Sequence, residues 1–282
     1  MKPRSIAEKL FFSTVRIDTL SEVGGMGSGT GFFFTHVVDG QAYPFVVTNK
    51  HVVMDAKRGR FSLHVIRGGD EENREKFELL IDPYMWRSMW VGHPDPNVDI
   101  AVAAFNPILV HVREKHGAEI FAHPIDTSLI PDAETLEELD ANESVVFIGY
   151  PNGLWDETNF LPIMRRGMTA TPMQVDFEGT PRFLIDASVF GGSSGSPVFI
   201  LNQGAITTRN GGLFSGTRFL FVGVVAATYL LTSHNKVVEL PVPTSTELVV
   251  SQQERIDIGV VFKAHTVVEA IEWVLRANKI IS

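Results

Sequence analysis

The sequence predicts a mostly β protein, built as a β-sandwich or as a pair of β-barrels. Short runs rich in Val, Ile and Phe recur along the chain, and Gly, Pro, Asn or Asp stands at the ends of many of them. Helical patterns are few, and alternating strand and helix units are missing. Strands of this number and length, with so little helix, are typical of two packed β layers.

The expected strands follow one another from residue 31 to residue 262. They are Gly31–Val37, Phe45–Asn49, Phe61–Ile66, Phe77–Leu80, Ile100–Phe105, Val145–Tyr150, Met164–Ala170, Phe183–Ala187, Pro197–Leu201, Phe219–Thr228 and Ile256–Phe262.

Three segments have helical patterns, and two have the composition of connections. Ile6–Phe12 is short and amphipathic, Ala133–Leu139 follows a Pro-Asp start, and Thr266–Asn278 repeats apolar residues at helical spacing. We expect the charged Arg67–Lys76 to be a solvated hairpin loop and the acidic Asp126–Glu143 to connect two halves of the fold.

Composition excludes several classes of function. The 282 residues have 44% hydrophobic side chains, enough for a substantial core. The net charge of −9 disfavours a protein that binds nucleic-acid phosphates. There is no cysteine, so disulfides, thiolate metal sites and a cysteine nucleophile are excluded.

The apolar runs are too short for a membrane span. Residues 1–18 lack an apolar run of signal-peptide length, and Phe219–Leu231 is shorter than the ~18 apolar residues that a spanning helix needs. We therefore expect a cytoplasmic protein that has no membrane partner.

One glycine-rich segment carries a candidate nucleophile. Residues 186–199 read DASVFGGSSGSPVF. Glycines allow a tight turn and leave backbone N–H groups open to approach, so such a turn can present a serine beside two oxyanion donors. On its own, the segment could equally be a surface loop.

Two further residues make a catalytic interpretation stronger. His51 follows the run PFVVTNK, and Asp99 precedes another apolar run in NVDIAVAAF. A serine hydroxyl becomes nucleophilic when an imidazole takes its proton and a carboxylate orients that imidazole. The order His51, Asp99, Ser194 is therefore more informative than any one of these residues.

The motifs GSGTGFFF, TNKHVV, NVDIAV and DASVFGGSSGSPV resemble the trypsin-like serine peptidases, most closely the bacterial HtrA type. The resemblance implies two six-stranded antiparallel β-barrels and a C-terminal helix. Within a domain at 19–282 that follows an N-terminal segment at 1–18, the barrels would span about 19–125 and 140–263, and the helix 266–278. HtrA proteins carry a PDZ domain after the peptidase, and we expect none here.

The resemblance also implies roles for the site residues. His51 would be the general base, Asp99 would orient it, and Ser194 would attack the carbonyl. The N–H groups of Gly192 and Ser194 would form the oxyanion hole. The remaining expected contacts concern the substrate, with Ser188 in the specificity pocket and Val224, Val225 and Ala226 pairing with the substrate backbone. The small Ser188 and Ala226 favour cleavage after small or aliphatic residues.

Two expectations concern regulation. Ser193 stands where the digestive enzymes have an aspartate that pairs with a newly cut N-terminus, so we expect no activating cleavage. Because two glycines precede Ser193, we expect the peptide that forms the oxyanion hole to flip easily, so that the resting hole can be mis-set and then corrected by substrate or by an activating protein partner. An oligomer is the other possible partner.

Three alternatives were weighed. Residues 191–195 also match G-x-S-x-G, the nucleophile motif of α/β-hydrolases, which would make Ser193 the nucleophile of an esterase, but the required strand–turn–helix context is missing. A metal enzyme could use His93 with Asp95 and Asp99, or His111 and His116, but the spacing of the last pair fails as a ligand motif. The third is a catalytically silent relative that binds peptides. The sequence thus predicts a serine endopeptidase that acts on polypeptides without a metal or an organic cofactor.

Overall fold

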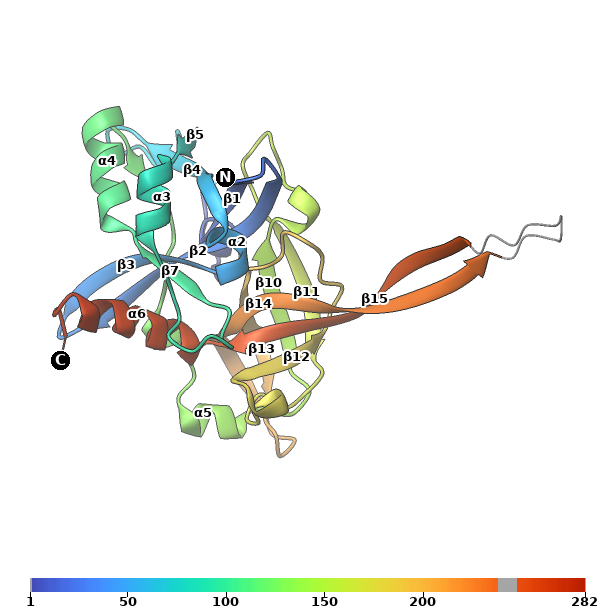
Figure 1. Cartoon of the computed structure of the whole chain (residues 1–282). Coiled ribbons are helices and arrows are strands. Elements are labelled where there is room, and N and C mark those ends of the chain that lie inside the picture. Colours follow the sequence, from blue (N-terminus) through green and yellow to red (C-terminus); the bar gives the residue numbers. More distant parts are fainter. Residues whose placement is uncertain (1, 238–247, 282) are drawn as a thin grey trace, which may run out of the picture.

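The computed structural model describes residues 2–237 and 248–281, and between residues 230 and 256 it describes the backbone alone. The fold is mostly β, with two sheets side by side and a C-terminal helix, as predicted (Figure 1). No described helix is long and apolar enough to cross a membrane.

The first sheet has nine strands. Seven follow the order β5-β4-β1-β2-β3-β7-β6, while β8 pairs with β4 and β9 pairs in parallel with β2. Its strands are β1 (Thr14–Ser21), β2 (Met26–Val38), β3 (Gln41–Thr48), β4 (Ala56–Ile66), β5 (Glu75–Leu80), β6 (Trp90–Gly92), β7 (Ala101–Ala104), β8 (Glu119–Ile120) and β9 (Ile125–Asp126). The expected count of six was therefore too low for this half, and β1 begins ahead of the expected boundary at residue 19.

The second sheet is a closed six-stranded antiparallel barrel, in the order β10-β11-β12-β15-β14-β13, as predicted for this half. Its strands are β10 (Ser144–Gly149), β11 (Ile163–Thr169), β12 (Arg182–Asp186), β13 (Pro197–Thr207), β14 (Leu213–Val237) and β15 (Leu248–Lys263). Beyond the barrel, β14 and β15 continue as a hairpin that projects from the body (Figure 1).

Six α-helices lie outside the described strands. They are α1 (Ile6–Leu10), α2 (Lys50–Val53), α3 (Pro83–Met89), α4 (Asn106–His116), α5 (Ala133–Glu138) and α6 (His265–Ala277). The sequence prediction included α1, α5 and α6 but missed α2, α3 and α4. The segment expected to connect the halves contains a 3₁₀ turn, Thr127–Leu129, and α5.

A shared core joins the two sheets. One cluster of buried side chains combines Phe32 and Val47 of the first sheet with Phe221 of the second and Val267 and Ile271 of α6. Helix α6 contacts β6 and β7 on one side and β15 on the other. Because burial of apolar surface is the main favourable term in folding, this cluster fixes how the sheets face each other, and with them the loops at their junction.

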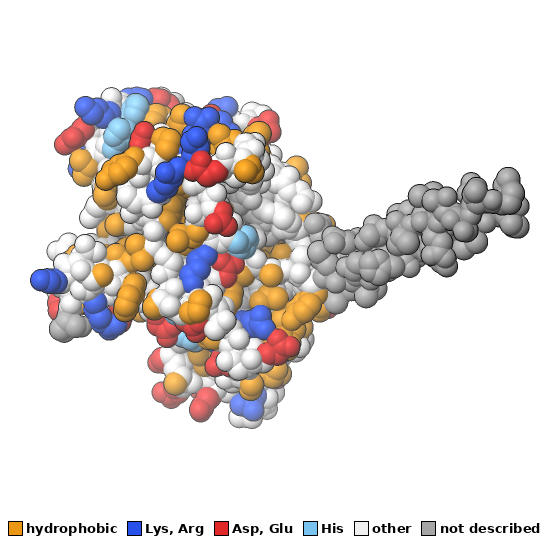
Figure 2. All heavy atoms as spheres, viewed as in Figure 1, with side chains coloured by type: hydrophobic (Ala, Val, Ile, Leu, Met, Phe, Trp, Pro, Cys, Tyr) orange, Lys and Arg blue, Asp and Glu red, His pale blue; other side chains and the backbone are white. Residues whose placement is uncertain are grey.

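The surface carries both signs of charge. Figure 2 shows acidic and basic side chains interspersed over the face drawn there.

Candidate active site at the junction of the two sheets

His51 lies at the start of a short helix that directly follows a buried strand. Strand β3 ends at Thr48, and α2 begins at Lys50. Val53, two residues after His51, is buried in the core of the first sheet, which anchors the helix. The His51 side chain itself is 51% exposed, so its ring is accessible from solvent.

Asp99 engages His51 through both carboxylate oxygens. Its Oδ2 lies 2.5 Å from Nδ1 of the His51 ring, and its Oδ1 accepts a hydrogen bond from the His51 backbone N–H at 3.1 Å. The Asn49 side chain donates to the Asp99 carbonyl at 2.6 Å. A carboxylate that accepts from Nδ1 favours the tautomer whose Nε2 is unprotonated and able to accept a proton.

The loop that carries Asp99 is tied to α2 and to α6. Lys50 Nζ donates to the Asp95 carbonyl at 2.8 Å, and burial lowers the pKa of this ammonium, an effect that the charges of Asp99 and Asp95 oppose. The His93 ring accepts from the Asp95 backbone N–H at 3.1 Å and lies 3.0 Å from Oε2 of Glu269 on α6. Both contacts hold the loop against the first sheet.

Ser194 lies in the glycine-rich turn that was predicted, between β12 and β13. Gly195 has φ +86°, and a Cβ there would lie 1.9 Å from the carbonyl oxygen of Thr30. Only glycine combines this left-handed conformation with so close an approach of two backbones. The Ser194 carbonyl accepts from Thr30 N–H at 2.9 Å, which joins the turn to the first sheet.

Thr30 is a buried bridge that sequence reasoning missed. Its hydroxyl donates to the Gly192 carbonyl at 2.9 Å and accepts from the Tyr150 N–H at 3.1 Å. Its own carbonyl accepts from the Thr48 hydroxyl at 2.7 Å. One residue of β2 thereby connects the Ser194 turn, the end of β10 and the strand that leads to His51.

The peptide between Gly191 and Gly192 has one defined orientation. The Gly191 carbonyl accepts a hydrogen bond from the Asn152 N–H. Because N–H and C=O point in opposite directions across a trans peptide, the Gly192 N–H faces away from Asn152. Among the residues described here, neither the Gly192 N–H nor the Ser194 N–H has an acceptor. The structure therefore shows this peptide in one orientation, and the expectation that the hole can be mis-set stays a prediction.

The Ser194 hydroxyl donates to the Ala226 carbonyl at 3.3 Å. Within the described part of the chain, no hydrogen bond links it to the His51 ring. Catalytic hydrogen bonds are often long or poorly aligned without substrate. The structure thus pairs the His51 ring with Asp99, while the Ser194 hydroxyl is bonded to the Ala226 carbonyl.

Two residues expected to pair with substrate are already paired within the protein. Val225 N–H donates to the Ser196 carbonyl at 2.9 Å, its carbonyl accepts from Gly195 N–H at 2.8 Å, and Val224 pairs with Pro197 and Phe262. Both valines are fully buried. The expectation that they bind a substrate strand was therefore wrong.

The pairing of β13 with β14 ends at Pro197 and Val224, so β14 has a free edge beyond that point. Ala226, which we expect to pair with substrate, lies at the start of this edge, and Ala227 and Thr228 extend it. Sequence reasoning missed these last two because the end of a strand pairing leaves no signal in the residues themselves. Ser188 is half-buried and precedes Phe190 in the turn.

Ser193 is not accessible. It is 1% exposed, and its hydroxyl has no hydrogen-bond partner among the described residues. A nucleophile must reach its substrate, so this burial argues against the esterase interpretation. The chain also returns to a strand, β13, after the turn rather than to a helix.

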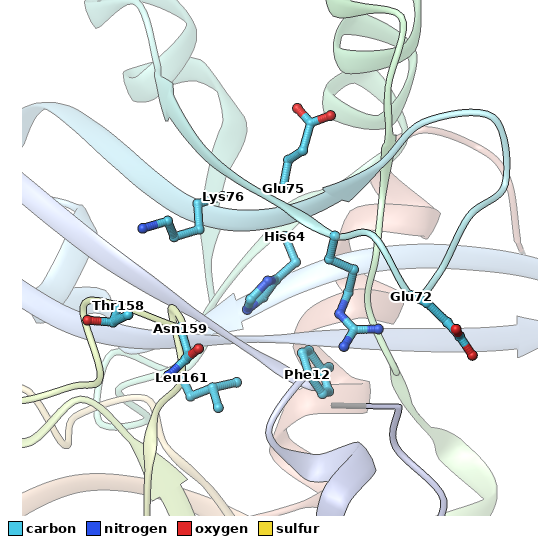
Figure 3. A pocket seen from close by; sticks show the side chains of 9 residues that line it. Phe12, His64, Glu72, Glu75, Lys76, Thr158, Asn159 and Leu161 are labelled. Carbon is cyan, nitrogen blue, oxygen red and sulfur yellow. The ribbon is translucent and has the colours of Figure 1, made fainter.

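A cavity of about 610 Å³ is lined on one side by Thr158, Asn159 and Leu161. These residues belong to the connection between β10 and β11, which also carries Asn152. Figure 3 shows Lys76, His64 and Phe12 around the cavity, with Thr158 and Asn159 from the loop opposite. His64 Nε2 lies 3.0 Å from the carbonyl oxygen of Phe160, and burial lowers the pKa of the ring.

Aromatic and cationic contacts continue from this cavity toward Asn152. The Phe160 ring packs on Trp155 at 4.6 Å between centroids, and Arg16 lies over Trp155 while donating to the Gly153 carbonyl at 2.7 Å. These contacts brace the loop that holds the Gly191 carbonyl.

Comparison with known proteins places the chain in a family. Residues 29–207, more than half of the chain, match the model of the trypsin-like peptidase domain. The chain therefore belongs to the trypsin-like peptidase family, as the motifs predicted.

Three solved structures that are similar to the chain come from different organisms. The Rv3671c protease of M. tuberculosis, in its active form, is 19% identical, with a TM-score of 0.45 and coverage of 95% of this chain and 82% of that one. An inactivated protease paralogue of the scabies mite is 13% identical, with a TM-score of 0.47 and coverage of 95% and 96%. A catalytically inactive tobacco etch virus protease in complex with substrate is 13% identical, with a TM-score of 0.43 and coverage of 80% and 76%. No curated protein matches the chain.

Proposed function

We propose that the protein is a serine endopeptidase that hydrolyses peptide bonds in polypeptides through an acyl-enzyme. The observation that carries the proposal is the contact of the Asp99 carboxylate with Nδ1 of His51 beside the first sheet, opposite a turn of the second sheet that carries Ser194. Among the described residues, this turn also has two backbone N–H groups that have no acceptor. Family membership and the burial of Ser193 support it.

Each residue has one role in the first half of the reaction. Ser194 Oγ attacks the substrate carbonyl carbon while His51 Nε2 takes its proton, and Asp99 stabilises the resulting imidazolium. The carbonyl oxygen becomes an oxyanion that accepts from the N–H groups of Gly192 and Ser194. When the intermediate collapses, His51 protonates the leaving amine and the acyl group remains on Ser194.

Water completes the cycle by the same steps. His51 takes a proton from water as the water attacks the ester, and the second intermediate expels Ser194 Oγ, which regains its proton from His51. The substrate backbone pairs with the free edge at Ala226–Thr228 as an added strand. All of this chemistry uses groups of the chain and water.

A fluorophosphonate probe tests the proposal, because it bonds to a serine only when a base and an oxyanion hole activate that serine. We expect the wild type and Ser193→Ala to be labelled and Ser194→Ala to stay unlabelled. Labelling lost in Ser193→Ala and kept in Ser194→Ala would favour an esterase. A wild type that is neither labelled nor active on any peptide contradicts the proposal and leaves a peptide-binding relative.

A further inference from the structure

Arg165 lies against the turn that carries Ser194. It is on β11 opposite Phe147 of β10, so the two side chains share one face of the barrel wall. Its guanidinium carbon lies 5.5 Å from the centre of the Phe147 ring and 4.9 Å from that of Phe190. Phe190 is followed directly by Gly191 and Gly192, so the cation packs on the residue that leads into the oxyanion peptide.

This cation has no anionic partner in the part of the chain that is described. Nη1 of Arg165 is buried and has no hydrogen-bond acceptor among the residues that the structure describes. Burial lowers the pKa of the guanidinium, and the charge of Asp257 only partly opposes this effect. Aromatic faces attract a cation, but they do not replace the acceptors that a buried N–H loses from water.

The segments around Arg165 are those that flank the reacting residue of a substrate. Ala187 N–H donates to the Asp257 carbonyl at 2.8 Å, and the Thr228 hydroxyl donates to the Ile258 carbonyl at 3.0 Å. The stretch before Phe190, the free edge of β14 and the start of the paired part of β15 are therefore neighbours. A substrate acylated on Ser194 and paired with Ala226–Thr228 places its reacting residue between Phe190 and that edge.

We propose that Arg165 selects substrates with an acidic side chain, Glu or Asp, at the residue whose carbonyl is attacked. A carboxylate is the ligand that suits an unpartnered, partly buried guanidinium, because its two oxygens accept from two N–H groups at once. This inference rests on the proposed function. It replaces the expectation of cleavage after small or aliphatic residues. That expectation was based on Ser188 and Ala226 alone, because the sequence did not show that β11 brings Arg165 to the turn.

Turnover of matched substrates is the first test. The probes are sets of fluorogenic tetrapeptide amides in which the residue before the leaving group is fixed as Glu, Asp, Gln, Ala or Leu. Because loss of one partner of a buried charge pair is costly, we expect kcat/KM for Glu to exceed that for Gln by about 30-fold or more. In Arg165→Met this ratio falls to about one.

Two control variants separate charge from folding. Arg165→Lys keeps the charge and retains part of the preference. Arg166→Met alters the next residue, which is exposed and points to the opposite face of β11, and leaves the preference unchanged. Thermal unfolding of Arg165→Met identifies a variant that has lost its fold.

A binding measurement keeps this inference independent of catalysis. Acetylated tetrapeptides ending in Glu or Gln are titrated into Ser194→Ala and into Ser194→Ala/Arg165→Met. A Glu preference that is present in the first protein and absent in the second supports the Arg165 site even when the wild type shows no turnover, an outcome that would contradict only the proposed function. Equal affinity for the two peptides, or no binding of either, overturns the Arg165 assignment.

Discussion

The backbone N–H of Asn152 donates to the carbonyl of Gly191, and this contact sets the direction of the next N–H, that of Gly192. The contact joins a loop after β10 to the turn after β12, two segments that are 39 positions apart in the numbering of the chain. An oxyanion hole is useful when its donors need no rearrangement as charge develops. In the structure described here, this contact already turns the Gly192 N–H away from Asn152.

Replacement of Gly192 tests that arrangement. A Cβ at Gly192 would lie 2.4 Å from the Tyr150 carbonyl oxygen, and φ there is +81°. We expect Gly192→Ala to shift the peptide and to lower kcat by about 10²–10³, the cost of losing one oxyanion donor. Gly191→Ala is the matched control, because its nearest atom would be Asn152 Oδ1 at 3.7 Å. Equal losses in the two variants would refute the assignment.

Asp99→Asn tests the orientation of the base. An asparagine can present its N–H to Nδ1 of His51, which favours the tautomer with the proton on Nε2. We expect kcat to fall about 10⁴-fold, as in the serine peptidase for which this substitution is known. The control is Asp95→Asn, whose carboxylate accepts only the Asn97 N–H among the described hydrogen bonds. Steady-state rates and the rate of fluorophosphonate labelling should change together in Asp99→Asn and hardly at all in the control.

Thr30→Val tests the bridge between the sheets. Valine keeps the shape but removes the hydroxyl that binds the Gly192 carbonyl and the Tyr150 N–H, both in a buried setting. We expect the free energy of unfolding to fall by about 1–3 kcal/mol, measured by urea denaturation. Thr30→Ser retains the hydroxyl and should lose less. If valine, which lacks only the hydroxyl, costs no more than serine, which lacks only the methyl group, then the two hydrogen bonds do not stabilise the bridge.

Acid should destabilise the fold through His64. Burial holds the pKa of this ring below its ordinary value of 6.5, and the charge of Arg74 lowers it further, while the hydrogen bond with Phe160 opposes both. The unfolded chain therefore takes up its proton near pH 6.5, before the folded protein does. The stability that the neutral His64 ring contributes is fully present above pH 6.5. It is lost as the pH falls from there through the lower pKa of the folded state, by up to about 1.4 kcal/mol for each pH unit.

His64→Gln should make the loss of unfolding free energy with falling pH less steep. His111→Gln, at an exposed position on α4, should leave that loss unchanged. Urea denaturation at pH 7.5, 6.5 and 5.5 provides the comparison. Burial also lowers the pKa values of His36 and His123, so a residual slope is expected in the variant. If the free energy of unfolding of His64→Gln changes with pH as steeply as that of the wild type, protonation of His64 does not cause the acid destabilisation.

The order of motifs in the chain was sufficient to predict the fold class and to bring His51 and Asp99 together. Local signals for α3 and α4 were also present and were overlooked. Asp82 caps α3 ahead of Pro83, and α4 has proline in its first turn and ends at Gly117 with φ +59°. These are ordinary start and stop signals, and they were hidden by the strand-like composition around them.

The contacts that the sequence did not reveal all join segments distant in the chain. Asn152 reaches Gly191 because β10 and the Ser194 turn meet at the sheet junction, and Arg165 reaches Phe190 through the curvature of the barrel. Val224 and Val225 look suitable for substrate pairing until the register with β13 and β15 is known. Register depends on the whole barrel, and no local pattern specifies it.

Helix α6 reaches the site through one contact, between Glu269 and His93, and His93 in turn binds the backbone of the loop that carries Asp99. In the chain, His51, Asp99 and Ser194 all precede Glu269. The loop that carries Asp99 therefore gains this outer anchor only when α6 docks, after the residues of the proposed site have themselves been made.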